Sequence, residues 1–487
     1  MTPSGDAAGG SAGPGAGGVD ASGRYQDPVP GGRPEDAARA RELTAQLAER
    51  GVQGVVMSWI DTCGVNRVKS VPVARLESAA RWGVGMSPVF DTFLADDSIV
   101  GSALQGGPDG DLRLVPDLDQ VVALAGQPGW AWAPVDRMRQ DGTMHPGCNR
   151  TLLRRIVRDA ASTGLTFKAS IEIEFALGRG DVPHPEFEPA CVGSSYGMTR
   201  LVEQADFCAD ALAALAAQGV QVDQIHPEYA AGQYEVSVGV LDPVAAADRS
   251  VLVRQTLRAV AQRHGLRISF APSVVAGGVG NGGHLHLSAW QGGVNLHSTG
   301  DGRYGMTGAG EAFVAGVLDA LPALAAVVTP SPSSYLRLQP SHWAGVYACW
   351  GHETRESAIR LVSGMIGNRE RAANLEVKCA DLAANPYLAL AGLVGAGRDG
   401  IARGLTLPEE ITGDPSALSP DEARQRGINR LPTTLEQAVA EFVANPLMAA
   451  TFGELIADAV VAVRRGEAAR VVGLTEVDIA TAYRWVY

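Results

Sequence analysis

The amino-acid sequence predicts an α+β fold with a curved, mostly antiparallel β-sheet. In the middle of the chain, strand-like runs are separated by gaps of hairpin length and by helices, and there is no internal repeat. Residues 201–218 and 311–328 have the pattern of long, alanine-rich amphipathic helices. Strands that follow one another closely favour antiparallel pairing, and helices mixed among them indicate the α+β class.

The N-terminal part of the chain begins with a segment that we expect to be disordered. Residues 1–34 are rich in Gly, Ala, Ser and Pro, and such a composition buries too little apolar surface to fold. A helix is predicted over residues 35–50, ending at Gly51. Two β-rich runs, 52–60 and 65–73, then flank a predicted hairpin turn at Asp61-Thr62-Cys63-Gly64.

At 487 residues the chain exceeds the usual size of one hydrophobic core, so two folded domains are expected. A turn-rich segment over residues 141–149 precedes a predicted helix over 151–163. We place the domain boundary in this segment, which gives domains over 35–143 and 144–487. A Pro- and Ser-rich loop follows at 329–346, and a helical segment closes the chain from about Leu431.

Bulk composition excludes several classes of protein. The formal net charge of −13 and the lack of basic tracts argue against nucleic-acid binding. The six cysteines are scattered without a CxxC pair, which favours a reducing cytoplasm over a disulfide framework or a zinc site. No apolar run approaches transmembrane length and no signal peptide is evident, so we expect a cytoplasmic protein without membrane contact.

Four stretches combine an apolar face with a polar face, as alternation along a strand allows. They are FKASIEIEF (167–175), EYAAGQYEVSV (228–238), GNGGHLHLS (280–288) and NLEVK (374–378). Their polar faces carry Glu172, Glu174, Gln233, Glu235, His284, His286, Ser288, Glu376 and Lys378. A lone Glu-x-Glu is more often a solvated strand edge. Four repeats of the pattern instead favour carboxylates that share a cavity, whose repulsion hard divalent ions would neutralise.

A glycine-rich loop precedes the histidines, and its letters match GxGxxG over residues 278–283. This loop leads into a strand rather than a helix, so a dinucleotide-binding interpretation is weak. The chain also lacks a GxxxxGK[ST] motif. Any bound phosphates would therefore depend on metals, backbone amides and the cationic residues Arg337, Arg355, Arg360 and Lys378.

At these residues the chain resembles the glutamine synthetase family, specifically its bacterial type-I-like branch. The resemblance runs in order from about residue 51 to 445, through IEIE, EYAAGQYE, GGHLHLS, YLRL, TRESAIR and EVKCADLAANPYLALA. It implies a small N-terminal β-grasp domain before a larger catalytic domain. It also implies a homo-oligomer, with a dodecamer of two stacked hexameric rings as the family's usual form and each active site between neighbouring subunits.

The same resemblance implies roles for individual residues. Glu174, Glu228 and Glu235 would hold one divalent ion, Mg²⁺ or Mn²⁺, and Glu172, His284 and Glu376 the other. Contacts to ATP are implied for His286, Ser288 and Arg360, contacts to glutamate for Gly280 and Arg337, and a place near the transferring phosphate for Arg355. Asp61 would reach the active site of the next subunit and help to bind and deprotonate the amine.

The implied activity is that of an ATP-dependent ligase, which phosphorylates the side-chain carboxylate of glutamate and then forms a γ-glutamyl amide. Ammonia-using members carry a flap glutamate at the position of Trp343, so we expect an organic amine as the acceptor. Lys378 replaces an arginine and cannot form its bidentate fork, which leaves the acid substrate open. The alternatives are glutamine synthetase proper, a catalytically silent structural or regulatory assembly, and a metal-binding module without ATP chemistry.

Overall fold

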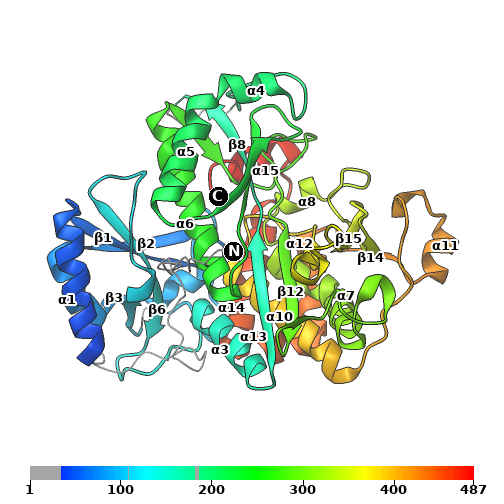
Figure 1. Ribbon diagram of the computed structural model, residues 1–487, viewed down its shortest axis with the longest axis horizontal. Helices are drawn as coiled ribbons and strands as arrows, with labels where there is room; N and C mark the ends of the chain where they lie inside the picture. The colour runs from blue at the N-terminus through cyan, green and yellow to red at the C-terminus, as the bar shows by residue number, and fades with distance from the viewer. Residues whose placement is uncertain (1–33, 108, 181–185) are drawn as a thin grey trace, which may run out of the picture.

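The computed structural model describes residues 34–107, 109–180 and 186–487 (Figure 1). The predicted disorder of residues 1–34 lies outside this part of the chain, except for Pro34, which begins the first helix. The predicted α+β class is confirmed, because three β-sheets of six, four and seven strands are combined with helices throughout.

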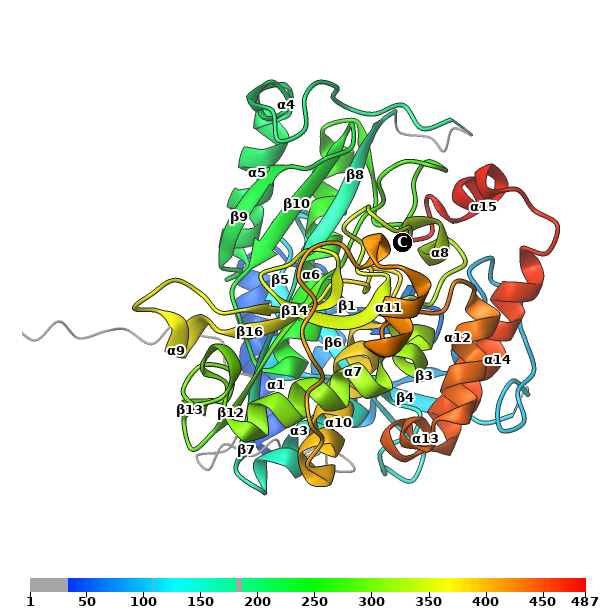
Figure 2. The same cartoon turned by 90° about the vertical axis from the view of Figure 1, so that its right-hand side faces the viewer.

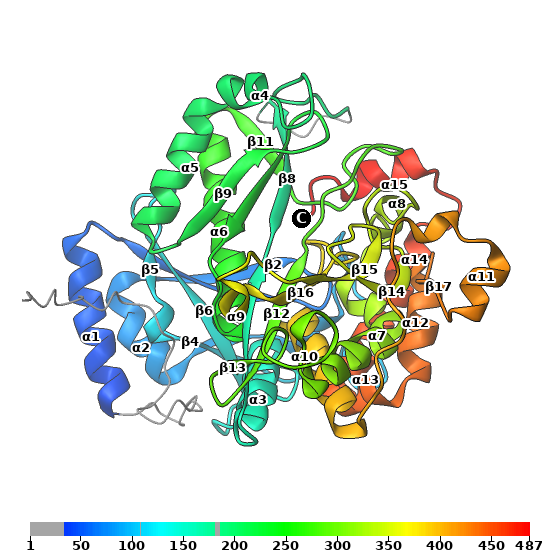
Figure 3. The ribbon, with the colours of Figure 1, turned by 45° about the vertical axis from the view of Figure 1, so that its right-hand side comes forward.

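The N-terminal sheet lies on the left in Figure 1 and has the strand order β2-β1-β6-β4-β3, with β5 paired to β6. Its strands are β1 (Gly54–Ile60), β2 (Asn66–Pro72), β3 (Val84–Met86), β4 (Leu112–Pro116), β5 (Val122–Ala123) and β6 (Trp130–Met138). The helices α1 (Pro34–Glu49) and α2 (Leu76–Trp82) lie beside it, as Figure 3 shows. The predicted hairpin is confirmed, since β1 and β2 pair antiparallel with Ile60 opposite Asn66.

The larger part of the chain contains the other two sheets (Figure 3). The four-stranded sheet has the order β11-β8-β10-β9, and the seven-stranded sheet has the order β13-β12-β16-β15-β14-β17, with β7 paired to β12. Every pairing in them is antiparallel except β14 with β15, as the sequence predicted. Their strands are β7 (Leu165–Ile171), β8 (Ile173–Arg179), β9 (Val222–Pro227), β10 (Gln233–Val238), β11 (Leu266–Ser269), β12 (Leu285–Gln291), β13 (Val294–Asn295), β14 (Tyr347–His352), β15 (Ser357–Val362), β16 (Asn374–Val377) and β17 (Asn429–Arg430).

The stretch 167–175, expected to be one strand, is two. The chain leaves the seven-stranded sheet at the end of β7 and enters the four-stranded sheet at β8, with Glu172 between them. The predicted apolar face is nevertheless correct, because Phe167, Ala169, Ile171, Ile173 and Phe175 are all buried in the main core. Alternation in the sequence continues across the junction and therefore gives no sign of it.

The helices cover the sheets and close the chain (Figure 2). They are α3 (Asn149–Ala161), α4 (Met198–Glu203), α5 (Ala205–Ala217), α6 (Pro243–Arg263), α7 (Gly308–Val328), α8 (Ser334–Arg337), α9 (Arg369–Ala372), α10 (Pro386–Arg403), α11 (Pro420–Gln425), α12 (Leu435–Ala444), α13 (Pro446–Phe452), α14 (Glu454–Arg470) and α15 (Glu476–Tyr483). Local signals fix their ends: α10 starts with an Asn385 cap followed by proline and stops at Gly404, which adopts the left-handed conformation. Two expectations need correction, since the helix predicted over 201–218 is broken at Gln204 and the loop 329–346 contains α8.

One helix among the described residues, α7, is long and apolar enough to cross a membrane by length and composition. The pair α13 and α14 meets the same criterion only if the two are taken together across a bend of 117°. Most of α7 is buried, and it packs against α10 and α12 in the main core, as a core helix would.

Candidate active site

Strand pairing brings polar side chains from distant parts of the chain together. Glu174 on β8 lies directly opposite Glu235 on β10. Glu376 on β16 lies opposite His286 on β12 at one edge and opposite Arg360 on β15 at the other. The polar faces of the two sheets therefore meet where β7 gives way to β8.

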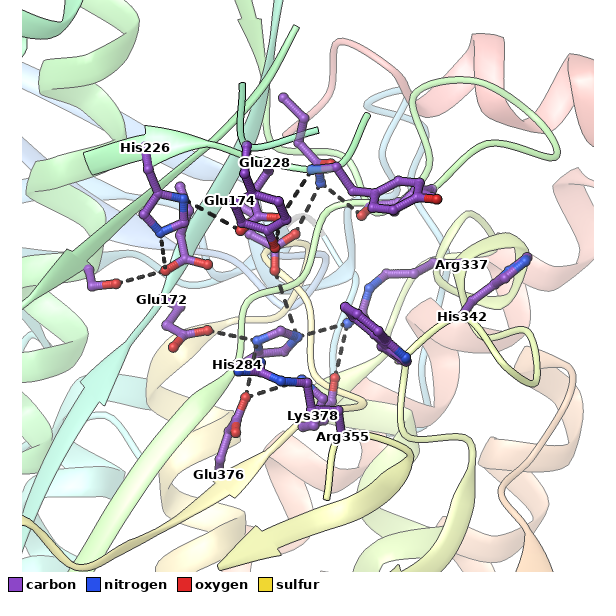
Figure 4. A pocket seen from close by; sticks show the side chains of 18 of the residues that line it. Glu172, Glu174, His226, Glu228, His284, Arg337, His342, Arg355, Glu376 and Lys378 are labelled. Carbon is purple, nitrogen blue, oxygen red and sulfur yellow. Dashed lines mark hydrogen bonds and ion pairs between the residues drawn. The ribbon is translucent and has the colours of Figure 1, made fainter. Parts of the chain in front are cut away.

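A cavity of about 600 Å³ opens at this meeting point (Figure 4). It is lined by carboxylates, imidazoles, cationic side chains and aromatic rings: Glu172, Glu174, Tyr196, Gln224, His226, Glu228, Tyr229, Gln233, Glu235, Ser237, Gly278, Val279, Gly280, His284, Arg337, Ser341, His342, Trp343, Arg355, Arg360, Glu376 and Lys378. The predicted sharing of one cavity by carboxylates from different strands is confirmed.

His284 lies at the centre of this group (Figure 4). Its Nδ1 is 2.7 Å from Oε2 of Glu172 and 3.4 Å from Oε1 of Glu376. Its Nε2 is 3.8 Å from Oε1 of Glu174 and 3.2 Å from Nη2 of Arg337. The imidazole of His284 thus lies among three carboxylates, one on β8, one on β16 and one at the junction of β7 and β8.

Three groups of side chains in the described residues place potential metal-ligand atoms within 4.8 Å of one another. They are Glu172 with Glu174 and His284, Glu172 with His286 and Glu376, and His226 with Glu228 and Glu235. Carboxylate oxygens with an occasional imidazole suit Mg²⁺ and Mn²⁺. The members of the two predicted ligand sets are all present, but they are grouped differently, with Glu172 in two groups and His226 beside Glu228 and Glu235.

The protein does not fully compensate the negative charge of the carboxylates in the cavity. Burial, with the nearby carboxylate of Glu235, raises the pKa of Glu174 although His284 and Arg337 act against it. Burial likewise raises the pKa of Glu228, which also faces Glu174 and Glu235. Both shifts mean that the ionised forms lack sufficient positive charge around them, and a bound divalent cation would supply it. The donor set therefore fits such an ion.

The other carboxylates are already paired with protein cations. Burial opposes ionisation of Glu172, but the imidazoles of His286 and His284 outweigh it and hold the pKa of Glu172 well below its usual range. For Glu376, Lys378 and the same imidazoles overcome burial and lower the pKa to about 2. The pKa of His286 rises to about 9, because the attraction of Glu172 exceeds the effect of burial.

The four predicted cationic residues all line the cavity. Arg360 Nη1 lies 2.9 Å from Glu376 Oε2, and Lys378 Nζ lies 3.2 Å from Oε1 of the same residue. Arg337 donates to the main-chain oxygens of Lys378 and Cys379, which fixes its guanidinium next to His284. Arg355 is exposed at the opening.

Two further predicted substrate residues, Gly280 and Trp343, also line the cavity. The carbonyl of Gly280 accepts a hydrogen bond from Gln233 Nε2, which also donates to Glu174. Gly282 follows in the same loop, and its backbone N–H donates to Glu174 Oε2 at 2.8 Å. The glycine-rich loop therefore leads into a strand, as predicted, and its backbone binds the carboxylate of Glu174.

The remaining predicted residues lie outside the cavity lining. His286 contacts Glu172 behind His284, and Ser288 is buried further along β12, where it accepts a hydrogen bond from Trp290. Asp61 is completely buried in the β1–β2 turn, with Arg67 Nε 2.7 Å from its carboxylate. Its contribution to a neighbouring subunit stays a prediction, and it would require this ion pair to open.

Sequence reasoning missed His226, Tyr196 and Tyr229 as members of the site. His226 Nε2 lies 3.7 Å from Glu235 Oε1, and interaction with this carboxylate raises the pKa of His226 to about 9 although burial acts against it. Tyr196 donates its hydroxyl hydrogen to Glu228 at 2.7 Å. A signal existed only for His226, which precedes Glu228 by two residues and so shares its side of an extended chain.

Known proteins that resemble this chain belong to one family. The sequence model of the protein family described as glutamine synthetase, catalytic domain, matches residues 146–480 of this chain. The chain is 62% identical over 462 residues to the gamma-glutamylpolyamine synthetase GlnA3 of Streptomyces coelicolor, covering 95% of this chain and 99% of that protein. It is 30% identical to the glutamine synthetase of Clostridium saccharobutylicum, with 84% and 90% of the two chains covered.

Solved structures give the same result. A novel glutamine synthase homolog superposes with a TM-score of 0.80 at 33% identity, covering 90% of this chain and 99% of that one. The GmaS/ADP complex has a TM-score of 0.77 at 28% identity, covering 89% and 97%. By its sequence, its fold and its site, the chain belongs to the glutamine synthetase family.

Proposed function

We propose that this protein is an ATP-dependent ligase that joins the side-chain carboxylate of glutamate to an organic amine of the polyamine class, through an acyl phosphate. The observation that carries the proposal is the convergence of carboxylates from separate strands on His284, beside four cationic residues in one cavity. The gamma-glutamylpolyamine synthetase at 62% identity supports the choice of acceptor.

Members of this family use ATP and divalent metal ions, and the acidic groups of this chain suit such ions. We assign Glu174, Glu228 and Glu235 to one Mg²⁺ or Mn²⁺ ion and Glu172, His284 and Glu376 to another, with His226 as an additional donor near the first. When bound, these ions would neutralise the charge that spreads over the phosphoryl oxygens during transfer. The raised pKa values of Glu174 and Glu228 support this assignment, because burial and the neighbouring carboxylates disfavour their ionised forms, which a bound cation would stabilise.

The cationic side chains would bind the anionic substrates. Arg337 and Lys378 lie next to His284 and Glu376, where the glutamate carboxylates would be held. Arg360 and Arg355 would contact the phosphates, with His286 and Ser288 contributing to the nucleotide site. Gly280 presents backbone rather than a side chain to the substrate, since a Cβ there would lie 2.2 Å from the carbonyl oxygen of Pro272. Fixed charges of this kind stabilise the transition state without reorganisation.

We also propose the wider organisation of the protein. The domains would span 35–143 and 144–487, which is supported by two small apolar clusters around β1 and β6 that are separate from the main core. A homo-oligomer would complete each active site, with Asp61 contributed by a neighbour. The six cysteines are all free and buried, which supports a reducing cytoplasm as the place of action.

The test is to identify the product by mass spectrometry after incubation with ATP, glutamate, Mg²⁺ and a mixture of ammonia, monoamines and diamines. The expected result is a γ-glutamyl diamine, with ADP and phosphate formed in equal amounts and only when metal is present. Glutamine as the main product would make the protein a glutamine synthetase proper. Absence of metal-dependent ATP turnover with every acceptor would refute ligase activity altogether.

A further inference from the structure

The opening of the cavity is surrounded by exposed apolar side chains. Tyr196, Tyr229 and Trp343 are 57%, 55% and 54% exposed, and Val279 is 38% exposed, yet all four line the same cavity. They come from four separate segments: the loop before α4, the turn after β9, the glycine-rich loop and the loop after α8. Large apolar residues gathered in this way at the mouth of a cavity indicate a binding surface rather than scattered surface residues.

The aromatic side chains of Tyr229 and Trp343 differ from that of Tyr196 in their hydrogen bonding. The hydroxyl of Tyr196 is bonded to Glu228, so this ring faces the carboxylate cluster. Within the described parts of the chain, the hydrogen bonds of Tyr229 and Trp343 all involve their backbone atoms, so neither the Tyr229 hydroxyl nor the Trp343 indole N–H is bonded, and no protein cation lies over either ring. Tyr229 and Trp343 therefore present their faces and edges to whatever occupies the opening.

The loop that carries Trp343 is held in an unfavourable backbone conformation. Ser341 and Trp343 have positive φ angles of 59° and 55°, a region that residues other than glycine rarely adopt. Ser341 is anchored through its hydroxyl to Asp414 at 2.8 Å. The backbone N–H of Trp343 donates to Oε1 of Glu356 at 3.0 Å, and Glu356 is only 7% exposed. This carboxylate, next to Arg355 in the chain, holds the indole at the opening.

The chemistry of an aliphatic diamine matches this surface. Its reacting nitrogen must reach the activated side chain of glutamate, which Arg337 and Lys378 would hold inside the cavity, while its methylene chain and second ammonium extend toward the opening. Aromatic faces attract an ammonium group by cation–π interaction and cover methylene groups by apolar contact. A monoamine of the same length would gain only the apolar part.

On the basis of the proposed function, we infer that Tyr229 and Trp343 form the subsite for the second ammonium and the adjoining carbon chain of the acceptor amine. Glu356 is the positioning residue that keeps Trp343 in this subsite through its backbone N–H. The pair of rings selects diamines over monoamines and ammonia.

The first experiment compares kcat/KM for 1,4-diaminobutane and for butylamine, with glutamate and ATP saturating. In Trp343→Ala and in Tyr229→Ala, the ratio of the two values should fall by roughly 3- to 30-fold, as expected for loss of a cation–π contact. Trp343→Phe should retain part of the preference. The matched control is Trp82→Ala, which removes a 58% exposed tryptophan on α2 that does not line the cavity and should leave the ratio unchanged.

The second experiment tests Glu356. In Glu356→Gln the amide oxygen still accepts the bond from Trp343, so the diamine preference should remain, whereas Glu356→Ala should lose it as Trp343→Ala does. In the double variant Trp343→Ala/Glu356→Ala, the ratio should be no lower than in Trp343→Ala, because Glu356 acts through the indole. Equal loss in the Gln and Ala variants, or no loss in either, would overturn the positioning role.

Formation of γ-glutamyl hydroxamate from hydroxylamine separates this inference from the proposed function. Hydroxylamine has no carbon chain, so its reaction reports ligase chemistry and folding without the subsite. If the wild-type protein forms no hydroxamate, the proposed function itself fails. If it forms hydroxamate but shows equal kcat/KM for diaminobutane and butylamine, or if Trp343→Ala and Tyr229→Ala keep the wild-type ratio, the subsite is refuted while the ligase remains.

Discussion

Replacing Gly282 by alanine should disable the carboxylate cluster without altering any of its members. A Cβ added at this position would lie 2.5 Å from His284 Nε2, 2.7 Å from Glu174 Oε1 and 3.0 Å from Arg337 Nη2. Gly282 does not have a positive φ angle, so the effect comes from crowding and not from backbone strain. The methyl group would enter the space between two of the proposed metal ligands.

The size of the effect follows from these distances. Ordinary contact begins at 3.4 Å, so Nε2 of His284 must retreat by 0.9 Å (3.4 − 2.5) and Oε1 of Glu174 by 0.7 Å (3.4 − 2.7). Metal sites tolerate changes of only about 0.2 Å in their distances. We expect the affinity for Mn²⁺ to fall by roughly 10- to 100-fold, as when a ligand loses its support. Because the three atoms are the far ends of side chains and can move aside, overpacking should lower the free energy of unfolding by only about 1 kcal/mol, the low end of the usual range.

The assay is isothermal titration of the metal-free protein with Mn²⁺, together with hydroxamate formation and denaturant unfolding. Gly278→Ala is the matched control in the same loop, because its added Cβ meets nothing closer than 3.2 Å, at the carbonyl oxygen of Val275. The reasoning is wrong if Gly282→Ala binds Mn²⁺ with the affinity and stoichiometry of the wild-type protein.

Three other predictions concern charge. Burial raises the pKa of Asp61 to about 6 despite Arg67, so the folded state binds the proton of Asp61 more tightly than the unfolded chain does. The stability that this protonation contributes is therefore lost as pH rises from about 4 to 6. Asp61→Asn should remove this pH dependence, which is worth up to about 3 kcal/mol in the free energy of unfolding measured by titration at different pH. Because the nearby carboxylate of Glu235 raises the pKa of His226 to about 9, metal binding should release protons at pH 7 and tighten up to about pH 9. Calorimetry in buffers of different ionisation enthalpy would detect this release. Arg150 is buried among three aspartates, including Asp248 at 2.8 Å, and Arg150→Ala should cost about 3–5 kcal/mol of stability in denaturant unfolding; a loss below 1 kcal/mol would contradict it.

Local patterns in the sequence predicted the strands and their faces. The residues assigned to the apolar sides of the four stretches, among them Tyr234, Leu285 and Val377, are buried in the main core. The reason is that alternation depends only on neighbouring residues and on burial of one side. The same local reasoning identified the glycine-rich loop as an entry to a strand rather than to a helix.

Contacts between distant segments were beyond such reasoning. No local pattern states that Glu376 is paired with His286 and Arg360, because register between strands far apart in sequence is decided by the whole fold. Glu356 gave no signal either, since its function depends on a hydrogen bond to the backbone of Trp343. Almost every residue type has a backbone N–H, so the sequence does not indicate which N–H a buried carboxylate will bind.

The position of Glu172 explains why one carboxylate belongs to two groups. It lies between β7, which pairs with β12, and β8, which pairs with β10, so it is the point where the chain passes from one sheet to the other. Its backbone N–H donates to the carbonyl oxygen of His284, and its two carboxylate oxygens lie 2.7 Å from His284 and 2.9 Å from His286. A residue within a continuous strand would face one sheet only. The break in the strand therefore allows one acidic side chain to take part in two of the three groups, with Glu174 and His284 in one and with His286 and Glu376 in the other.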